Sequence, residues 1–400
     1  MGRPFRWLLA SSWASNVGDG IALAAGPLLV ASQTHDPFLV ASALLLQRLP
    51  WLIFGLHAGA IADRMDRRLL VVLSDSSRTV VITALVATIL MGRVDITIVL
   101  VAMFLLGISE VFADSASSTL LPMVVDTADL GTGNARLQAG VLVGNQFIGP
   151  PIGAFLFAAG MAWPFVVQIV SVALGVVLIA KVVVPTRPGG EPSGRARIGQ
   201  EIAQGIRWLL GNAAVRTLSL VILVFNITWG AAWSVLVLYA LVHLHMGEVG
   251  FGLLTSSTAV GGMVGTASFG WLQRHVSLAT LMRVCLLLEV LMHLALALTT
   301  VGWVAMVILF IFGVYAFVWA TVSNTVRQRA VPTEFQGRVG SVYFVGLMGG
   351  LIIGQALGGW IAGLFGLTAP FWFAFVGAGI TLLLVWRQLG HIAVATSADT

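Results

Sequence analysis

The chain has 400 residues, of which 58% are hydrophobic and 9% are charged, and its formal net charge is +5. A soluble domain has about 25% charged residues, so this composition excludes a soluble globular protein and predicts one surrounded mostly by lipid. The long unbroken apolar runs also exclude a membrane β-barrel, because barrel strands are short and alternate in polarity.

Twelve membrane-spanning helices are predicted, because one span needs roughly 20 apolar residues. In chain order they cover residues 7–33, 38–62, 70–92, 94–117, 135–160, 163–184, 215–243, 248–270, 278–300, 302–324, 338–363 and 368–388. Lipid cannot satisfy free backbone groups, so each span must be helical. The expected fold is an all-α membrane protein with 12 transmembrane helices in two pseudo-symmetric six-helix bundles.

The only long polar stretch divides the chain into two halves. Residues 1–184 form the first predicted bundle, 185–214 a basic cytoplasmic linker, and 215–400 the second bundle. Within the linker, apolar residues recur at helical spacing: Ile198, Ile202, Ile206 and Leu209. That spacing predicts an amphipathic helix lying on the membrane surface.

The two halves also resemble each other in sequence. A shift of 210 positions aligns Asn16 with Asn226 and Gly55 with Gly265, and a shift of 205 aligns Gly153 with Gly358. Such matches predict parallel six-helix repeats, although glycines in apolar sequence also match by chance.

The distribution of positive charge predicts the orientation. If both termini are cytoplasmic, the cytoplasmic loops hold most of the Lys and Arg residues, and only Arg93 falls clearly in an outer loop. All but one of the 21 positive residues are arginine, which suggests a GC-rich bacterial genome. We therefore expect a multi-pass protein of the bacterial cytoplasmic membrane.

The most specific motif follows the second predicted span. Its sequence is Gly59-Ala60-Ile61-Ala62-Asp63-Arg64-Met65-Asp66-Arg67-Arg68. It resembles the signature loop of the major facilitator superfamily, with Asp66 where glycine is usual, as in the macrolide-efflux and enterobactin-exporter-like branch. The resemblance implies a gate in which Gly59 allows close helix packing, Asp63 caps a helix end, and the arginines pair with acids. The alternative is a positively charged cytoplasmic anchor without a gating role.

A second motif lies in the fifth predicted span. Gly149, Pro150 and Gly153 are similar to the core of the antiporter motif of drug exporters, but Asn145 and Ala154 replace two of its glycines. The resemblance implies export. The alternative is a proline kink with small residues at a helix contact.

Ionisable residues inside spans are expensive and indicate function. Asp19 lies at a depth of ~18 Å in the first span and Arg48 at ~21 Å in the second, so we predict that they pair near the midplane. A buried aspartate beside an arginine is balanced between binding and releasing a proton, although the pair could also be permanent and structural. Glu110 is the second candidate for proton coupling.

Two further acids are ranked lower. Asp114 lies one turn after Glu110, near the inner membrane face, where it is predicted to hold Arg67 or Arg68 as part of the gate. Glu289 and His293 are four residues apart in the ninth span, whose position in this superfamily tends to lie outside the cavity.

The predicted substrate cavity has polar and aromatic walls. Ser12, Ser15, Asn16 and Asp19 share one face of the first span. Flat rings suited to amphiphilic or aromatic ligands come from the seventh and tenth spans: Asn226, Trp229, Trp233, Tyr315 and Trp319. Each ring could instead fill space between helices.

These features predict a proton-coupled exporter of small amphiphilic molecules such as drugs, working by alternating access. A dedicated siderophore or metabolite exporter, with Arg48 binding anionic substrates, and a non-transporting receptor are the alternatives. No phosphate-binding loop, metal cluster or nucleophile motif is present in the sequence, and Cys285 has no second cysteine to bond, so no enzyme is expected. We expect no metal and no cofactor, a proton gradient as energy source, no nucleic-acid partner, and a monomer.

Overall fold

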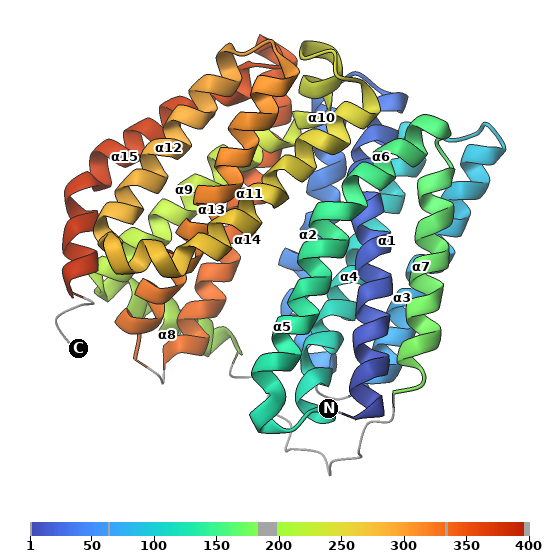
Figure 1. Cartoon of the computed structure of the whole chain (residues 1–400), viewed down its shortest axis with the longest axis horizontal. Helices are drawn as coiled ribbons and strands as arrows, with labels where there is room; N and C mark the ends of the chain where they lie inside the picture. Colours follow the sequence, from blue (N-terminus) through green and yellow to red (C-terminus); the bar gives the residue numbers. More distant parts are fainter. Residues whose placement is uncertain (1, 63–64, 183–197, 333–334, 396–400) are drawn as a thin grey trace. The chain divides into compact units, whose positions relative to one another are not determined.

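The computed structural model describes residues 2–62, 65–182, 198–332 and 335–395. These residues form helices and no strand, which confirms the predicted all-α membrane class (Figure 1). Ten helical segments in the described ranges are long and apolar enough to cross a membrane. The other two predicted spans are α7, which has 17 residues, and α11, so the number twelve remains a prediction.

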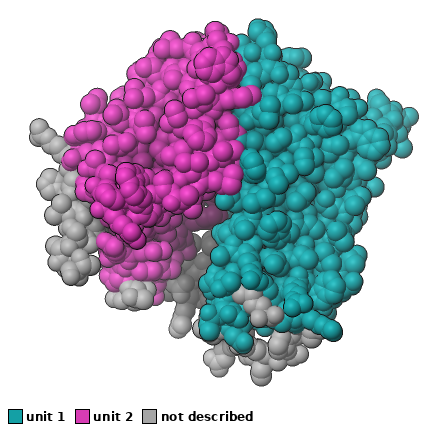
Figure 2. Space-filling view, in the orientation of Figure 1, with its two compact units in different colours: residues 1–192, 240–256 teal, residues 193–239, 257–400 magenta. Residues whose placement is uncertain are grey.

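The helices gather into two compact units, which Figure 2 colours separately. Unit 1 comprises residues 1–192 and 240–256, and unit 2 comprises residues 193–239 and 257–400. Residues 240–256 thus pack with the first half of the chain although they follow part of the second half. The two domain boundaries expected from the sequence stay a prediction.

Unit 1 is built around α1, which packs against α6 and α7, while α4 packs against α2 and α3. Its elements are α1 (Arg3–Gln33), α2 (Pro37–Ala62), α3 (Arg67–Leu90), α4 (Ile96–Val124), η1 (Thr127–Asp129), α5 (Leu130–Gly140), η2 (Val141–Ile148), α6 (Gly149–Ala159) and α7 (Trp163–Ile179). The segment from α5 to α6 is continuous and becomes π-helical just before Pro150. Proline removes a helix hydrogen bond and clashes with the preceding turn, so a local change of winding is expected there.

In unit 2, α9 packs against α14 and α15, and α12 packs against α13 and α15. The elements of the second half are α8 (Ile198–Gly211), α9 (Ala213–Ser234), α10 (Leu236–Leu238), η4 (Tyr239–His243), α11 (Gly247–His275), α12 (Leu278–Leu298), α13 (Gly302–Ala330), α14 (Gln336–Phe365) and α15 (Ala369–Ala395). The helix α11 begins in unit 1 and ends in unit 2.

Equivalent glycine contacts support the predicted internal repeat. In unit 1, a Cβ on Gly153 of α6 would overlap the carbonyl oxygen of Ile21 in α1. In unit 2, a Cβ on Gly358 of α14 would overlap the carbonyl oxygen of Ala231 in α9. The two glycines are 205 positions apart and the two carbonyls are 210 apart, which are the two shifts seen in the sequence. The same helix contact is therefore made once in each unit.

The outer faces of the helices are apolar, as contact with lipid requires. Large hydrophobic side chains such as Leu90, Phe365 and Leu383 are strongly exposed. The predicted linker helix exists as α8, and its Trp208 stacks on Phe335 with ring centroids 5.6 Å apart. Arg195 and Arg197, which lie just before it, fall outside the described residues.

Candidate functional site

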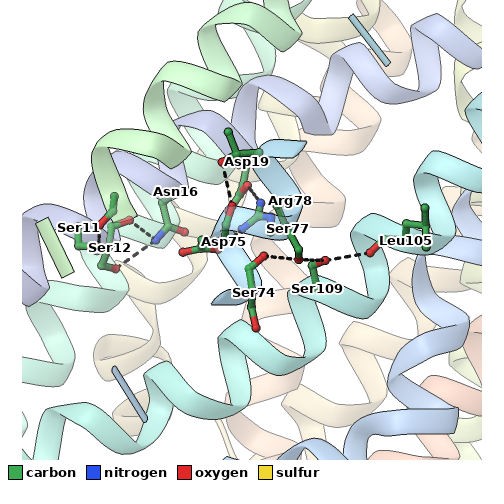
Figure 3. Close-up of polar contacts among 12 residues, drawn as sticks. Ser11, Ser12, Asn16, Asp19, Ser74, Asp75, Ser77, Arg78, Leu105 and Ser109 are labelled. Atoms are coloured by element: carbon green, nitrogen blue, oxygen red, sulfur yellow. Dashed lines mark hydrogen bonds and ion pairs between the residues drawn. The ribbon is translucent and has the colours of Figure 1, made fainter. Parts of the chain in front are cut away.

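A network of polar and charged side chains lies among α1, α3 and α4 in unit 1 (Figure 3). Arg78 of α3 forms an ion pair with Asp19 of α1 and a second with Asp75, 3.1 Å away on its own helix. Arg78 and Asp75 are buried, with 8% and 4% of their surfaces exposed, whereas the Asp19 side chain is 28% exposed. One buried guanidinium therefore holds two carboxylates, of which Asp19 is the more accessible.

Hydroxyl groups fix the helices that carry this network. Ser77 of α3 and Ser109 of α4 share a hydrogen bond of 2.8 Å, which ties the turn next to Arg78 to the neighbouring helix (Figure 3). On α1, Ser11 donates to the carbonyl of Gly175 in α7 at 2.8 Å. These contacts leave Arg78 and Asp19 little freedom to separate without moving a helix.

Arg48 of α2 and Glu110 of α4 also interact electrostatically with this network. Glu110 is attracted to Arg48 and Arg78, and the Gln47 side chain lies beside it. The two helices approach closely because Gly107 sits against the carbonyl of Gln47, where a Cβ would overlap it. The unit thus brings together all three residues predicted for proton coupling, and two more.

The predicted pairing of Asp19 with Arg48 is wrong, because Arg78 is the cation that pairs with Asp19. The depths of the two predicted partners match, but depth does not fix the direction in which a side chain leaves its helix. The sequence analysis also missed Asp75 and Arg78. Their signal was present, as an acid and an arginine three residues apart inside the apolar segment 70–92.

The described part of the signature loop contacts the ends of neighbouring helices. Arg67 donates to the carbonyl of Ala62 and lies 3.1 Å from the sulfur of Met123. Arg68 donates to the carbonyls of Ala180 and Val182 after α7, each at 3.3 Å. Such donors satisfy free carbonyls at helix ends.

Four other residues were predicted to belong to the gate. Asp63 and Arg64 fall outside the described residues. Asp114 is exposed on α4, and its predicted bond to Arg67 or Arg68 stays a prediction. Among described atoms, none lies within 4 Å of a Cβ placed on Gly59, so the close helix contact expected at that glycine is not seen.

The antiporter-like motif packs tightly against two other segments of unit 1. A Cβ on Gly149 would overlap the backbone of Gly20 in α1. On another side, Gly252 of α11 sits against Ala154 and the carbonyl of Pro150, while Ser256 donates to the carbonyl of Phe147 at 3.2 Å. The motif is therefore a contact of small residues, and a role in export remains a proposal.

Unit 2 contains a cluster of stacked rings that includes two residues of the predicted aromatic wall. Trp229 and Trp233 of α9 stack with centroids 5.0 Å apart, and each has Phe312 of α13 at 6.3 Å. These rings line a small cavity together with His293 of α12.

The other predicted wall residues are engaged differently. Trp319 is buried and stacks on Phe225, and Tyr315 is buried and bonded to Glu289. Asn226 donates to the carbonyl of Ile222 in its own helix, as Asn16 donates to Ser12 in α1. No group of three or more metal-ligating side chains occurs in the described part of the chain.

Comparison with known proteins identifies the family of this helical membrane protein. A model of the Major Facilitator Superfamily matches residues 8–350. The multidrug efflux pump Tap of Mycolicibacterium fortuitum is 26% identical, with 98% of this chain and 95% of that protein aligned. The enterobactin exporter EntS of Citrobacter koseri is 24% identical, with 97% and 92% aligned.

Solved structures share the fold at low sequence identity. A bacterial homologue of the iron transporter ferroportin superposes with a TM-score of 0.78 at 16% identity, covering 97% of this chain and 98% of that one. The nucleoside transporter NupG superposes with a TM-score of 0.72 at 12% identity, covering 100% and 99%.

Proposed function

We propose a function from one premise, which is that this chain belongs to the Major Facilitator Superfamily and is therefore a membrane transporter. The proposal is that it exports small amphiphilic organic molecules in exchange for protons, by alternating access. The observation that carries it is the ion-pair network in which Arg78 holds both Asp19 and Asp75 inside the membrane. Intramembrane acids of this kind mark proton relays.

We assign the binding and release of the proton to the carboxyl group of Asp19. It is more exposed than Asp75, so water reaches it first. Protonation of Asp19 removes one of the two negative partners of Arg78 and leaves the guanidinium paired with Asp75 on its own helix. The tie between α1 and α3 is then weakened, which couples proton binding to helix movement. Arg48 and Glu110 would tune this exchange.

The energy of one proton is sufficient for useful export. A membrane potential supplies about 2.3 kcal/mol per charge per 100 mV, and a tenfold gradient requires about 1.4 kcal/mol. One proton therefore sustains roughly a 40-fold gradient of a neutral substrate. No cofactor is needed for such a cycle.

The substrate class is supported by the relatives and by the aromatic rings of unit 2. One similar protein is a multidrug pump, and stacked Trp229, Trp233 and Phe312 suit flat amphiphilic molecules. A second candidate is a dedicated exporter of an anionic siderophore. It is favoured by the exposed Arg48 and by similarity to enterobactin exporters.

Further parts of the proposal concern the cytoplasmic gate, the direction of transport, the oligomeric state and the orientation in the membrane. The loop residues Gly59, Asp63, Arg64, Arg67 and Arg68, with Asp114, would gate the cytoplasmic side. The motif Gly149, Pro150 and Gly153 would favour export. We also propose a monomer in the bacterial cytoplasmic membrane with both termini cytoplasmic, following the positive-inside rule.

The test is proton release driven by substrate in vesicles that contain the purified protein. A cationic dye, a macrolide, a tetracycline and a catecholate siderophore are compared, first with wild type and then with Asp19→Asn. The matched control is Asp36→Asn, an identical change at an exposed acid that caps α2. We expect release with several unrelated amphiphiles, no release with Asp19→Asn, and normal release with Asp36→Asn. Release with the siderophore alone identifies a dedicated exporter, and undiminished release with Asp19→Asn overturns the proton assignment.

A further inference from the structure

A second ionisable cluster is buried in unit 2, on α12 and α13. The carboxylate of Glu289 accepts a hydrogen bond of 2.6 Å from the Tyr315 hydroxyl through Oε2. Its Oε1 lies 2.9 Å from Nε2 of His293, one turn along α12. Glu289 is 1% exposed and His293 is fully buried. Both carboxylate oxygens are thus committed inside the protein.

The cluster differs from the network of unit 1 in its charge. Among the described residues, no arginine or lysine lies within ion-pair distance of Glu289, and His293 is its only basic partner. A buried carboxylate beside a neutral imidazole leaves one uncompensated negative charge, which is costly. The arrangement therefore favours the uptake of one proton.

The other ionisable groups around Glu289 do not supply positive charge. Tyr315 and Cys285 both interact electrostatically with Glu289. Each is neutral when protonated and negative when ionised, so neither supplies positive charge. Tyr239 of η4 faces the same helix and donates its hydroxyl to the carbonyl of Leu296. The ionisable residues of α9 and α15 lie only at one end of each helix, at Arg216 and at Arg387 and His391.

The second ring nitrogen of His293 is buried without a partner. When Glu289 is ionised, Nε2 carries the hydrogen that it donates to the carboxylate, and Nδ1 of the neutral ring presents a lone pair. Nδ1 is buried and has no hydrogen-bond partner, and the same is true of Nε1 of Trp229. Both residues help to line one small apolar cavity of about 10 Å³, onto which neither unpartnered nitrogen opens.

We propose that the cluster of Glu289, His293 and Tyr315 is a second proton-binding site, in which the unpartnered Nδ1 of His293 takes up the proton. The proton adds to Nδ1 of His293 and forms one N–H bond. The resulting imidazolium is neutralised by the carboxylate of Glu289, and no other bond changes. Trp229, Trp233 and Phe312 line the same small cavity as His293, so a ligand that moves these rings alters the surroundings of the site. The role in coupling rests on the proposed function, but proton binding itself does not.

The first experiment measures proton binding without transport. Purified protein with ¹³C-labelled histidine is titrated by NMR, and the His293 signal is identified by its loss in His293→Gln. We expect this signal to titrate in the folded protein. In Glu289→Gln, which removes the carboxylate beside the ring, the titration of this signal should change. The control is Glu248→Gln, the same change at an exposed acid. A His293 signal that does not titrate, or is unmoved in Glu289→Gln, overturns the site.

The second experiment tests the coupling role, using a cationic dye in reconstituted vesicles. Glu289→Gln is expected to abolish dye uptake driven by a pH gradient while retaining exchange of dye at equal pH, which also reports correct folding. Tyr315→Phe should weaken uptake less, because the carboxylate remains. Wild-type rates and an unchanged pH profile in Glu289→Gln overturn the role in coupling. If wild-type protein releases no protons at all, the proposed function fails, while the NMR titration still decides whether the site binds a proton.

Discussion

Replacing Arg78 with glutamine probes the network that carries the proposed mechanism. Arg78→Gln removes the charge that Asp19 and Asp75 share and leaves both carboxylates in place. Removal of one partner from a buried ion pair costs about 3–5 kcal/mol, because an uncompensated charge remains. Asp75 accounts for most of that cost, since it is 4% exposed, whereas water partly screens Asp19.

The free energy of unfolding in mixed micelles measures this cost. Arg93→Gln is the matched control, since Arg93 is exposed in a loop and such changes stay within about 0.5 kcal/mol. The double variant Arg78→Gln with Asp75→Asn should recover part of the loss, because the stranded charge is gone. A coupling energy between the two sites of about 0.5–3 kcal/mol is expected from a double-mutant cycle. A loss below about 1 kcal/mol, or additive effects, would refute the shared-guanidinium argument.

Two further predictions concern packing. Gly153→Val forces a side chain into the carbonyl of Ile21, so unfolding should be easier by about 1–3 kcal/mol, whereas Gly131→Val, where no described atom lies within 4 Å, should lack this overpacking cost. Equal losses in the two variants contradict the contact. Tyr239→Phe removes the 2.6 Å hydrogen bond to Leu296 and should cost about 1 kcal/mol by the same assay, and no loss would mean that the bond contributes nothing.

Much of the fold follows from the sequence because lipid restricts the alternatives. Apolar runs predicted the helices, whereas the division of the chain at the polar interruption after Pro185 stays a prediction. The chain also places residues 240–256 in unit 1, which no composition signal predicts. In that placement, Gly252 fits against Pro150 and Ala154.

The site was harder to predict because the depth of a residue along its helix does not show in which direction its side chain points. Asp19 and Arg48 were placed at the same level, but α1 turns Asp19 toward α3 while Arg48 acts on Glu110. Tyr315 was assigned to a cavity wall from its spacing with Trp319, yet it points to Glu289. Only the packed structure distinguishes the two faces of a helix that is apolar almost all around.

The two ionisable clusters occupy equivalent helices, and this constrains their roles. The shift of 210 that relates the halves carries Thr79 of α3 to Glu289 of α12, one residue beyond Arg78. At this level unit 1 holds a cation shared by two acids, while unit 2 holds an acid with only a histidine as its basic partner among described residues. On the proposed assignments, a proton on Asp19 would break an ion pair between α1 and α3, whereas a proton on His293 would create an ion pair within α12. Protonation would then release a contact between helices in unit 1 and none in unit 2, so we expect the two sites not to substitute for each other and loss of either to uncouple transport in a distinct way.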